Sequence, residues 1–139
     1  MDALVKGIIF DKLDHNRLMK FLESNKKTQI VGSKCFFGKK HLIHSILQTI
    51  KAFRSKENIS KSEELEFLVR LSAQRQIKNA LIICKPTKKS VFICWAKNAD
   101  KIYSRLKKEF KLKEYRLKDP DMEKQKDAIE RTAAFYLSS

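Results

Sequence analysis

Residues 70–76 bring together side chains that could bind a polyanion. Within this short stretch the chain has two arginines and two amides, Arg70, Gln74, Arg75 and Gln76. Guanidinium groups hold phosphates through several rigid N–H donors, and amides can recognise base or ribose edges. The structural alternative is that these side chains cap helices and tie loops to backbone carbonyls. The residues alone leave both interpretations open.

The segment from Gly32 to Lys40 is a second candidate phosphate site. It follows an expected strand and opens an expected helix, as a P-loop does, but five residues separate its glycines instead of four. Lys40 also stands where a P-loop has the Ser or Thr that binds Mg²⁺. A nucleotide-hydrolysing loop is therefore disfavoured. Lys39, Lys40 and the free N–H groups of the helix start could still hold a phosphate.

Other chemistries find little support in the residue pattern. His41 and His44 lie three positions apart and could share a metal, but no third ligand is apparent, so we expect surface or phosphate-facing histidines. No nucleophile elbow, Cys–His arrangement or pair of acids in an apolar setting stands out. Phe36 and Phe37 are candidates for base stacking, with a structural role as the alternative. We expect no catalytic site, no metal and no cofactor.

Charge is the strongest global signal. The chain has 31 Lys and Arg against 16 Asp and Glu, a net charge of +15. Such an excess favours binding to phosphate-rich polymers, because neutralising phosphates releases counterions. The three cysteines form no C-x-x-C spacing, and neither a signal peptide nor a membrane-spanning stretch is apparent. We therefore expect a soluble intracellular protein with no membrane partner.

The hydrophobic pattern predicts an α/β fold of the α+β type in one domain over residues 1–139. We expect a small central sheet of about four mixed or mostly antiparallel strands, packed by five or six helices. The expected strands are residues 3–10, 28–31, 90–96 and an edge strand at Tyr115 and Leu117. The expected helices are one started by Asp11 or Asp14 and ending at about Ser24, 39–54, one started by Ser62, 77–83 (with a strand at 80–84 as the rival), one capped by Asn98, and a last one opened by Asp119-Pro120.

The last helix ends in an unusually apolar stretch. Met122, Ile129, Ala133 and Tyr136 or Leu137 share its expected inner stripe. Residues 133–137 (AAFYL) are apolar on more than one side, so part of this helix could face a partner.

The order of these features resembles one protein family. The residues that carry the resemblance are 39–46 (KKHLIHSI), 66–77 (EFLVRLSAQRQI) and, in support, 128–133 (AIERTA). They are similar to the kinase-binding small subunit of the KEOPS/EKC complex, the archaeal and eukaryotic relatives of the human PRPK-binding protein. The match covers most of residues 1–139. Ala73 stands where glycine is common in the family.

The resemblance implies a non-catalytic subunit that acts in the cytoplasm, and also in the nucleus if the source is eukaryotic. It would bind the small atypical kinase/ATPase of the complex and recruit tRNA through the 3′ CCA end for threonylcarbamoyladenosine modification. The expected RNA-facing residues are Lys39, Lys40, His41, Arg70, Gln74, Arg75 and Gln76. From its exposed apolarity, the kinase-facing surface is expected at Ile129, Ala133, Tyr136 and Leu137, with a place in the core as the alternative. A free-standing basic RNA-binding module, not tied to a kinase, is the alternative.

Overall fold

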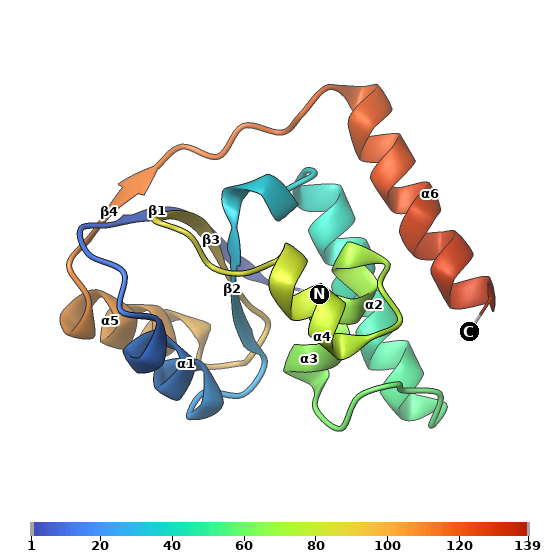
Figure 1. Ribbon diagram of the computed structural model, residues 1–139, viewed down its shortest axis with the longest axis horizontal. Coiled ribbons are helices and arrows are strands. Elements are labelled where there is room, and N and C mark those ends of the chain that lie inside the picture. Colours follow the sequence, from blue (N-terminus) through green and yellow to red (C-terminus); the bar gives the residue numbers. More distant parts are fainter. Residues whose placement is uncertain (1, 139) are drawn as a thin grey trace. The chain divides into compact units, whose positions relative to one another are not determined.

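The segments expected as strands pair into one antiparallel sheet. A computed structural model describes the backbone of residues 2–138 and the side chains of residues 2–135. Within that range it has four strands and six α-helices, so the expected α+β class is confirmed (Figure 1). Internal contacts group the chain into two compact units, unit 1 (Met1–Ser33 and Lys85–Leu117) and unit 2 (Lys34–Cys84 and Lys118–Ser139). One domain over residues 1–139 stays a prediction.

The sheet lies entirely in unit 1. Its strands run in the order β2-β3-β1-β4, and every neighbouring pair is antiparallel. Their bounds are β1 Leu4–Phe10, β2 Thr28–Gly32, β3 Lys89–Cys94 and β4 Leu112–Tyr115. The apolar run in β3 occupies an interior position, and residues 90–95 are all buried, as its composition predicts. The charged strand β4 lies at the edge, where exposed Lys113 and Glu114 discourage pairing with another chain, although Leu117 falls outside it.

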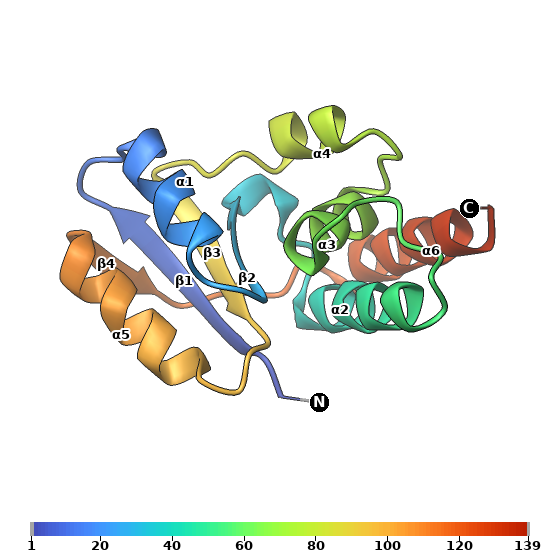
Figure 2. The same cartoon turned by 90° about the horizontal axis from the view of Figure 1, so that it is seen from below.

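Two helices of unit 1 cover one face of this sheet, α1 (His15–Glu23) and α5 (Ala99–Glu109) (Figure 2). The Asp14 carboxylate accepts the backbone N–H of Arg17 at 3.1 Å, so Asp14 caps α1, the second of the two starts we expected. Asn98 also stands at the start of its helix, but its side chain makes no capping bond. The core between helices and sheet is built from apolar side chains of both layers, among them Ile8, Phe10, Ile30, Phe92, Leu18, Phe21, Leu106 and Phe110.

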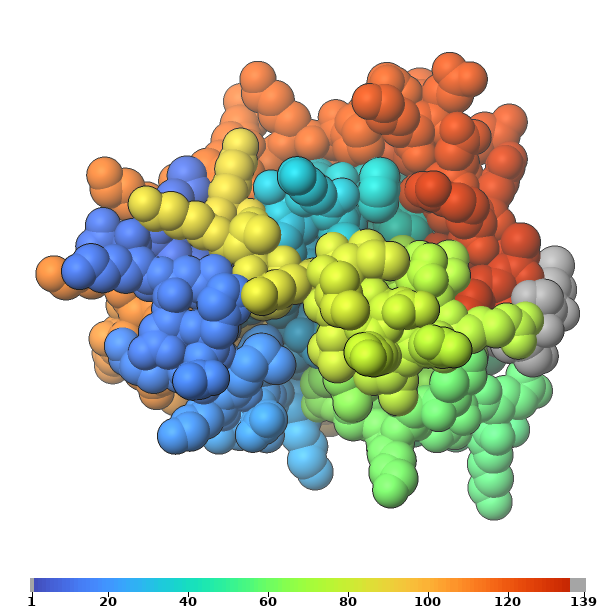
Figure 3. Space-filling model, in the orientation of Figure 1, coloured from blue at the N-terminus to red at the C-terminus, as the bar shows by residue number. Residues whose placement is uncertain are grey.

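Unit 2 is helical. It contains a 3₁₀ turn that begins at the unit boundary (Ser33–Cys35), α2 (Lys39–Arg54), α3 (Glu63–Ser72), α4 (Ile77–Ile83) and α6 (Met122–Ser138). The Ser62 hydroxyl accepts the N–H of Leu65 at 3.2 Å, which confirms the expected start of α3. Residues 80–84 belong to a helix and its end, so the rival strand prediction is wrong. The yellow-green α4 segment lies on the molecular surface (Figure 3), and its residues 81–83 are exposed.

The start and the inner face of α6 differ from the expectation. The helix begins at Met122, because the carboxylate of Asp121 accepts the N–H of Lys124 at 2.9 Å and takes the capping role. Its buried stripe is Ala128, Thr132 and Phe135, one position away from the stripe we expected. The apolar pattern of the sequence did not predict this stripe because one of its members, Thr132, is polar. Met122 is 83% exposed, Ile129 and Ala133 are half-buried, and the side chains of Tyr136 and Leu137 lie outside the described residues.

Two of the three cysteines are neighbours in unit 2. The Sγ atoms of Cys35 and Cys84 are 2.8 Å apart and share a hydrogen bond. That bond lowers the pKa of the Cys35 thiol, whereas the same bond and burial raise the pKa of Cys84. Cys94 lies in unit 1 beside the Thr28 hydroxyl at 3.3 Å. All three are free thiols, in line with their lack of paired spacing.

Candidate nucleic-acid interface

The basic and amide residues 74–76 form a tight joint between α3 and α4. Ala73 ends α3 in the left-handed conformation (φ 55°, ψ 37°), and the N–H of Gln74 then closes the turn on the carbonyl of Val69 at 3.2 Å. The carbonyl of Gln76 already accepts the N–H of Ala80 within α4. Gln74 is half-buried, whereas Arg75 and Gln76 are exposed. The joint therefore presents one guanidinium and two amides on a short, constrained loop.

An aromatic side chain of α6 supports Arg75. The guanidinium carbon of Arg75 lies 5.5 Å from the centre of the Phe135 ring, a cation–π distance. Phe135 itself is 6% exposed and forms part of the buried stripe of α6. The exposed cation is thus held against a fixed platform instead of moving freely in solvent.

Arg70 does not take the RNA-facing position that we expected. Its side chain is fully buried, and its Nε donates to Oε2 of Glu66 at 2.9 Å. The Arg70 guanidinium also lies 5.1 Å from the centre of the Phe135 ring. A buried charge requires such a partner, because the cost of removing it from water must be offset. We therefore reassign Arg70 to a structural role, held by a carboxylate of its own helix, whereas the structural alternative above had named a backbone carbonyl as the partner.

Glu66 extends this support to the loop before α3. Its Oε1 accepts the backbone N–H groups of Ile59 and Ser60, each at 2.8 Å. Glu66 therefore holds an arginine with one oxygen and a loop with the other, while being fully buried. Sequence reasoning missed this role, although the i, i+4 spacing of Glu66 and Arg70 in an apolar helix was a usable signal.

His41 also lies inside unit 2 instead of facing RNA. It is 1% exposed, and its Nε2 lies 3.0 Å from the hydroxyl of Thr132. That hydroxyl donates to the carbonyl of Arg70 at 3.1 Å, so Nε2 of His41 must carry the proton that it donates to Thr132. The carbonyl of Thr132 in turn accepts the amide of Gln48 at 2.9 Å. His41 therefore links α2 to α6 and, through Thr132, to α3.

The surroundings of His41 keep it neutral. Burial, the positive charge of Arg131 and the nearby His44 together lower its pKa to about 4. The ring contacts Phe37 edge-on, with centroids 5.7 Å apart, and the Arg131 guanidinium lies 5.4 Å from the centre of the Phe37 ring. A neutral, enclosed imidazole is suited to positioning helices and not to holding a phosphate.

The start of α2 is already occupied by an anion of the chain itself. Gly38 enters the helix at φ 102° and carries no capping side chain, and the N–H of Lys39 donates to the Asp119 carboxylate at 3.0 Å. The expected phosphate site on the backbone at this helix start is therefore revised, since Asp119 takes that N–H. Lys39 and Lys40 are both exposed, so their side chains stay available.

A groove of about 440 Å³ runs between Lys40 and α6. Its walls include Met122 and Ile129, with Gln125 and four charged side chains of the two helices. Ile129 was expected on the kinase-facing surface and Lys40 on the RNA-facing surface. The structure brings these two residues to the same groove, whereas Ala133 does not line it.

Comparison with protein families and curated proteins identifies no relative of this chain. No protein-family model matches the chain, and a search of curated proteins gives no match either. Among the described residues, no group of three or more His, Cys, Asp or Glu could hold a metal ion. No helix in that part of the chain is long and apolar enough to span a bilayer.

Proposed function

We propose that this chain is a non-catalytic adaptor of the KEOPS/EKC type, which binds the small kinase/ATPase of the complex and recruits tRNA through its 3′ CCA end. The observation that carries the proposal is the exposed Arg75 held against Phe135 between two amides. A fixed guanidinium suits a phosphate of a single strand, and the flanking Gln74 and Gln76 suit base or ribose edges. Lys39 and Lys40 add further exposed positive charge in the same unit.

The tRNA contact is tested by a gel-shift titration at two salt concentrations. Full-length tRNA is compared with the same tRNA lacking its CCA end, using the wild type and Arg75→Ala. We expect removal of CCA and replacement of Arg75 each to abolish most binding, with little further loss when both are combined. Lys78→Ala, an exposed cation of α4, is the matched control and should retain most of the affinity. Binding that depends on salt but not on CCA or Arg75 would contradict the assignment of residues 74–76 as the tRNA contact.

We propose the groove beside α6 as the contact with the kinase. Its exposed Met122 and half-buried Ile129 give an apolar surface with charged walls, as interfaces between proteins often have. We expect the chain to copurify 1:1 with the kinase, and Ile129→Asp to abolish copurification while retaining tRNA binding. Lys124→Asp, an exposed change on the same helix outside the groove, should leave the complex intact.

The alternative function is a basic RNA-binding module that acts without a kinase. One observation favours it: unit 1 holds seventeen Lys and Arg against seven Asp and Glu, and thus contributes +10 of the net charge of +15. None of the RNA-facing residues expected above lies in that unit. RNA binding that is indifferent to CCA, combined with no affinity for the kinase, would favour the alternative.

A further inference from the structure

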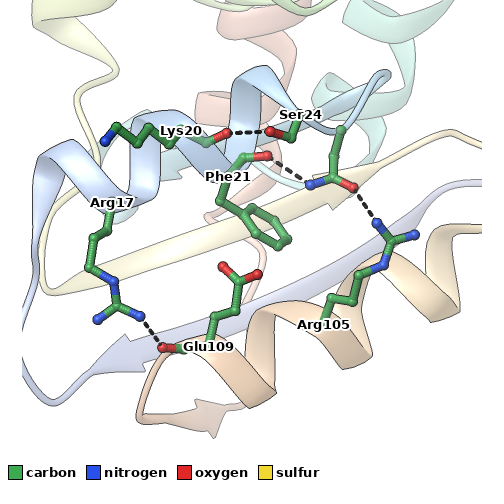
Figure 4. Close-up of a pocket in the computed structure, with 7 residues that line it drawn as sticks. Arg17, Lys20, Phe21, Ser24, Arg105 and Glu109 are labelled. Carbon is green, nitrogen blue, oxygen red and sulfur yellow. Dashed lines mark hydrogen bonds between the residues drawn. The ribbon is translucent and has the colours of Figure 1, made fainter.

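Part of the charge excess of unit 1 lies around a pocket between α1 and α5. The pocket measures about 330 Å³ and is lined by Arg17, Lys20, Phe21, Ser24, Asn25, Arg105 and Glu109. Arg17 and Lys20 come from α1 and Arg105 from α5, so cations stand on opposite sides of it (Figure 4). The carboxylate of Glu109 points between the two arginines and offsets one of the three positive charges.

Neutral acceptors hold both guanidiniums in place. Arg17 donates from Nη2 to the carbonyl of Glu109 at 2.6 Å and lies 4.8 Å from the centre of the Phe110 ring. Arg105 donates from Nη1 to Oδ1 of Asn25 at 3.1 Å, and Asn25 in turn donates to the carbonyl of Phe21 at 2.7 Å. Each bond uses one N–H of the guanidinium, and its acceptor carries no charge. The remaining donors are pre-oriented, so less entropy is lost when they bind an anion.

A second depression continues the basic surface along α5. It measures about 350 Å³, and Lys101, Arg105 and Lys108 line it together with Asp100 and Ser104. Arg105 belongs to both depressions, so the two share a wall. All five cations are exposed, and none forms an ion pair with a carboxylate among residues 2–135. Two adjacent positive depressions match the repeated phosphates of a polymer better than one isolated anion.

From this arrangement we propose that the α1–α5 surface binds the phosphate backbone of RNA at a site separate from the joint in unit 2. A lipid surface fits less well, because the only large apolar side chain exposed in the described part of unit 1 is Met19 at 38%. The contact is to phosphates and carries no base specificity, so structured double-stranded RNA is a suitable ligand. The inference rests on the proposed function only in taking RNA as the ligand.

The test compares two triple variants of equal charge change. Lys20→Gln, Lys101→Gln and Lys108→Gln remove exposed cations from the two depressions. Lys12→Gln, Lys88→Gln and Lys113→Gln remove three exposed cations of unit 1 that line neither depression. Binding is measured to tRNA and to a blunt RNA duplex across a range of salt, with thermal melting to confirm folding.

We expect the pocket triple to lose about tenfold or more in affinity for both RNAs, and the slope of log K against log salt to fall by about two to three. The control triple should lose about threefold or less. Equal losses in the two triples would overturn the proposal, because the charge would then act as a diffuse coat. Displacement of RNA by inorganic phosphate, but not by chloride at the same ionic strength, would also overturn it in favour of a small-anion site.

The blunt duplex separates this inference from the proposed function, because it has no single-stranded CCA end. If Arg75→Ala and CCA removal weaken tRNA binding while the pocket triple behaves like its control, only the inference at α1–α5 is wrong. If CCA removal has no effect but the pocket triple still weakens duplex binding, the adaptor proposal falls and the α1–α5 surface stands.

Discussion

The Arg75 guanidinium lies 5.5 Å from the centre of the Phe135 ring, so the exposed cation of the joint depends on a residue of the last helix. Because a cation–π contact at an exposed site is worth about 0.5–1 kcal/mol, we expect Phe135→Leu to weaken tRNA binding about two- to fivefold. The gel-shift titration measures this. In an Arg75→Ala background the same change should have no further effect. An undiminished effect in that background would show that Phe135 acts by another route.

The ion pair of Glu66 and Arg70 should be essential to folding. Glu66→Ala leaves a buried guanidinium without its carboxylate and frees two loop N–H groups, so we expect a loss of about 3–5 kcal/mol in the free energy of unfolding. Urea denaturation of the purified protein measures it. The exposed pair Lys126–Glu130, 4.0 Å apart, gives the control, and Glu130→Ala should change stability by about 0.5 kcal/mol or less.

Stability should fall in mild acid because of His41. Its pKa is about 4 in the folded chain and 6.5 as an unperturbed imidazole, so between these values the unfolded chain binds a proton that the folded chain excludes. The free energy of unfolding should therefore decrease as pH falls from about 6.5 to 4, by about 3 kcal/mol, and change little from this group below pH 4. His44, whose pKa burial also lowers, acts in the same direction.

Urea melts at several pH values test the role of His41. We expect His41→Gln to flatten the pH dependence in that window, whatever its stability at pH 7. The matched control is His15→Gln, since His15 is exposed at the start of α1. A slope unchanged by His41→Gln would show that other groups carry the acid sensitivity.

Ala73 should be a site where glycine stabilises the protein. It adopts φ 55°, a left-handed conformation that costs an L-residue about 1–2 kcal/mol and costs glycine almost nothing. Glycine also makes the unfolded chain more flexible, and this entropy lowers the free energy of unfolding by about 0.4–1 kcal/mol. We therefore expect Ala73→Gly to raise the free energy of unfolding by about 0.5–1 kcal/mol. A decrease in the urea melt would contradict this account of the joint.

Local signals in the sequence predicted most of the fold. The stripe in residues 39–54 predicted α2 with its observed bounds. Ser62 predicted the start of α3, and Asp14 was one of two candidates for the start of α1. Such signals succeed because amphipathic periodicity and side-chain caps act within a few residues. The start of the last helix was harder to predict from the sequence. Asp119-Pro120 suggested an earlier start, but the carboxylate that accepts an N–H of the first turn of α6 is that of Asp121. The Asp119 carboxylate instead accepts the N–H of Lys39 at the start of α2. A cap supplied from a distant segment leaves no local pattern.

The sequence predicted which residue types lie near the candidate site but not which of their side chains are exposed. The sequence placed Arg70 and Arg75 together as anion-binding groups, yet one lies buried on Glu66 and the other lies exposed beside Phe135. Burial of these side chains depends on how α3 and α6 pack, which one sequence does not encode in any short window. For the same reason His41, between two exposed lysines and an apolar residue, could not be recognised as the partner of Thr132.

The interleaved order of the two units has a consequence for synthesis on the ribosome. Unit 2 takes α2–α4 from residues 34–84 and α6 from residues after 117, so the whole second half of unit 1 is made in between. At 5–20 residues per second, that gap lasts about 2–7 s. During this time His41 and the carbonyl of Arg70 lack the Thr132 hydroxyl that links them, and α2 lacks its cap from Asp119. The nascent helices of unit 2 therefore emerge with their polar interior incomplete, and a chaperone has a defined interval in which to bind them.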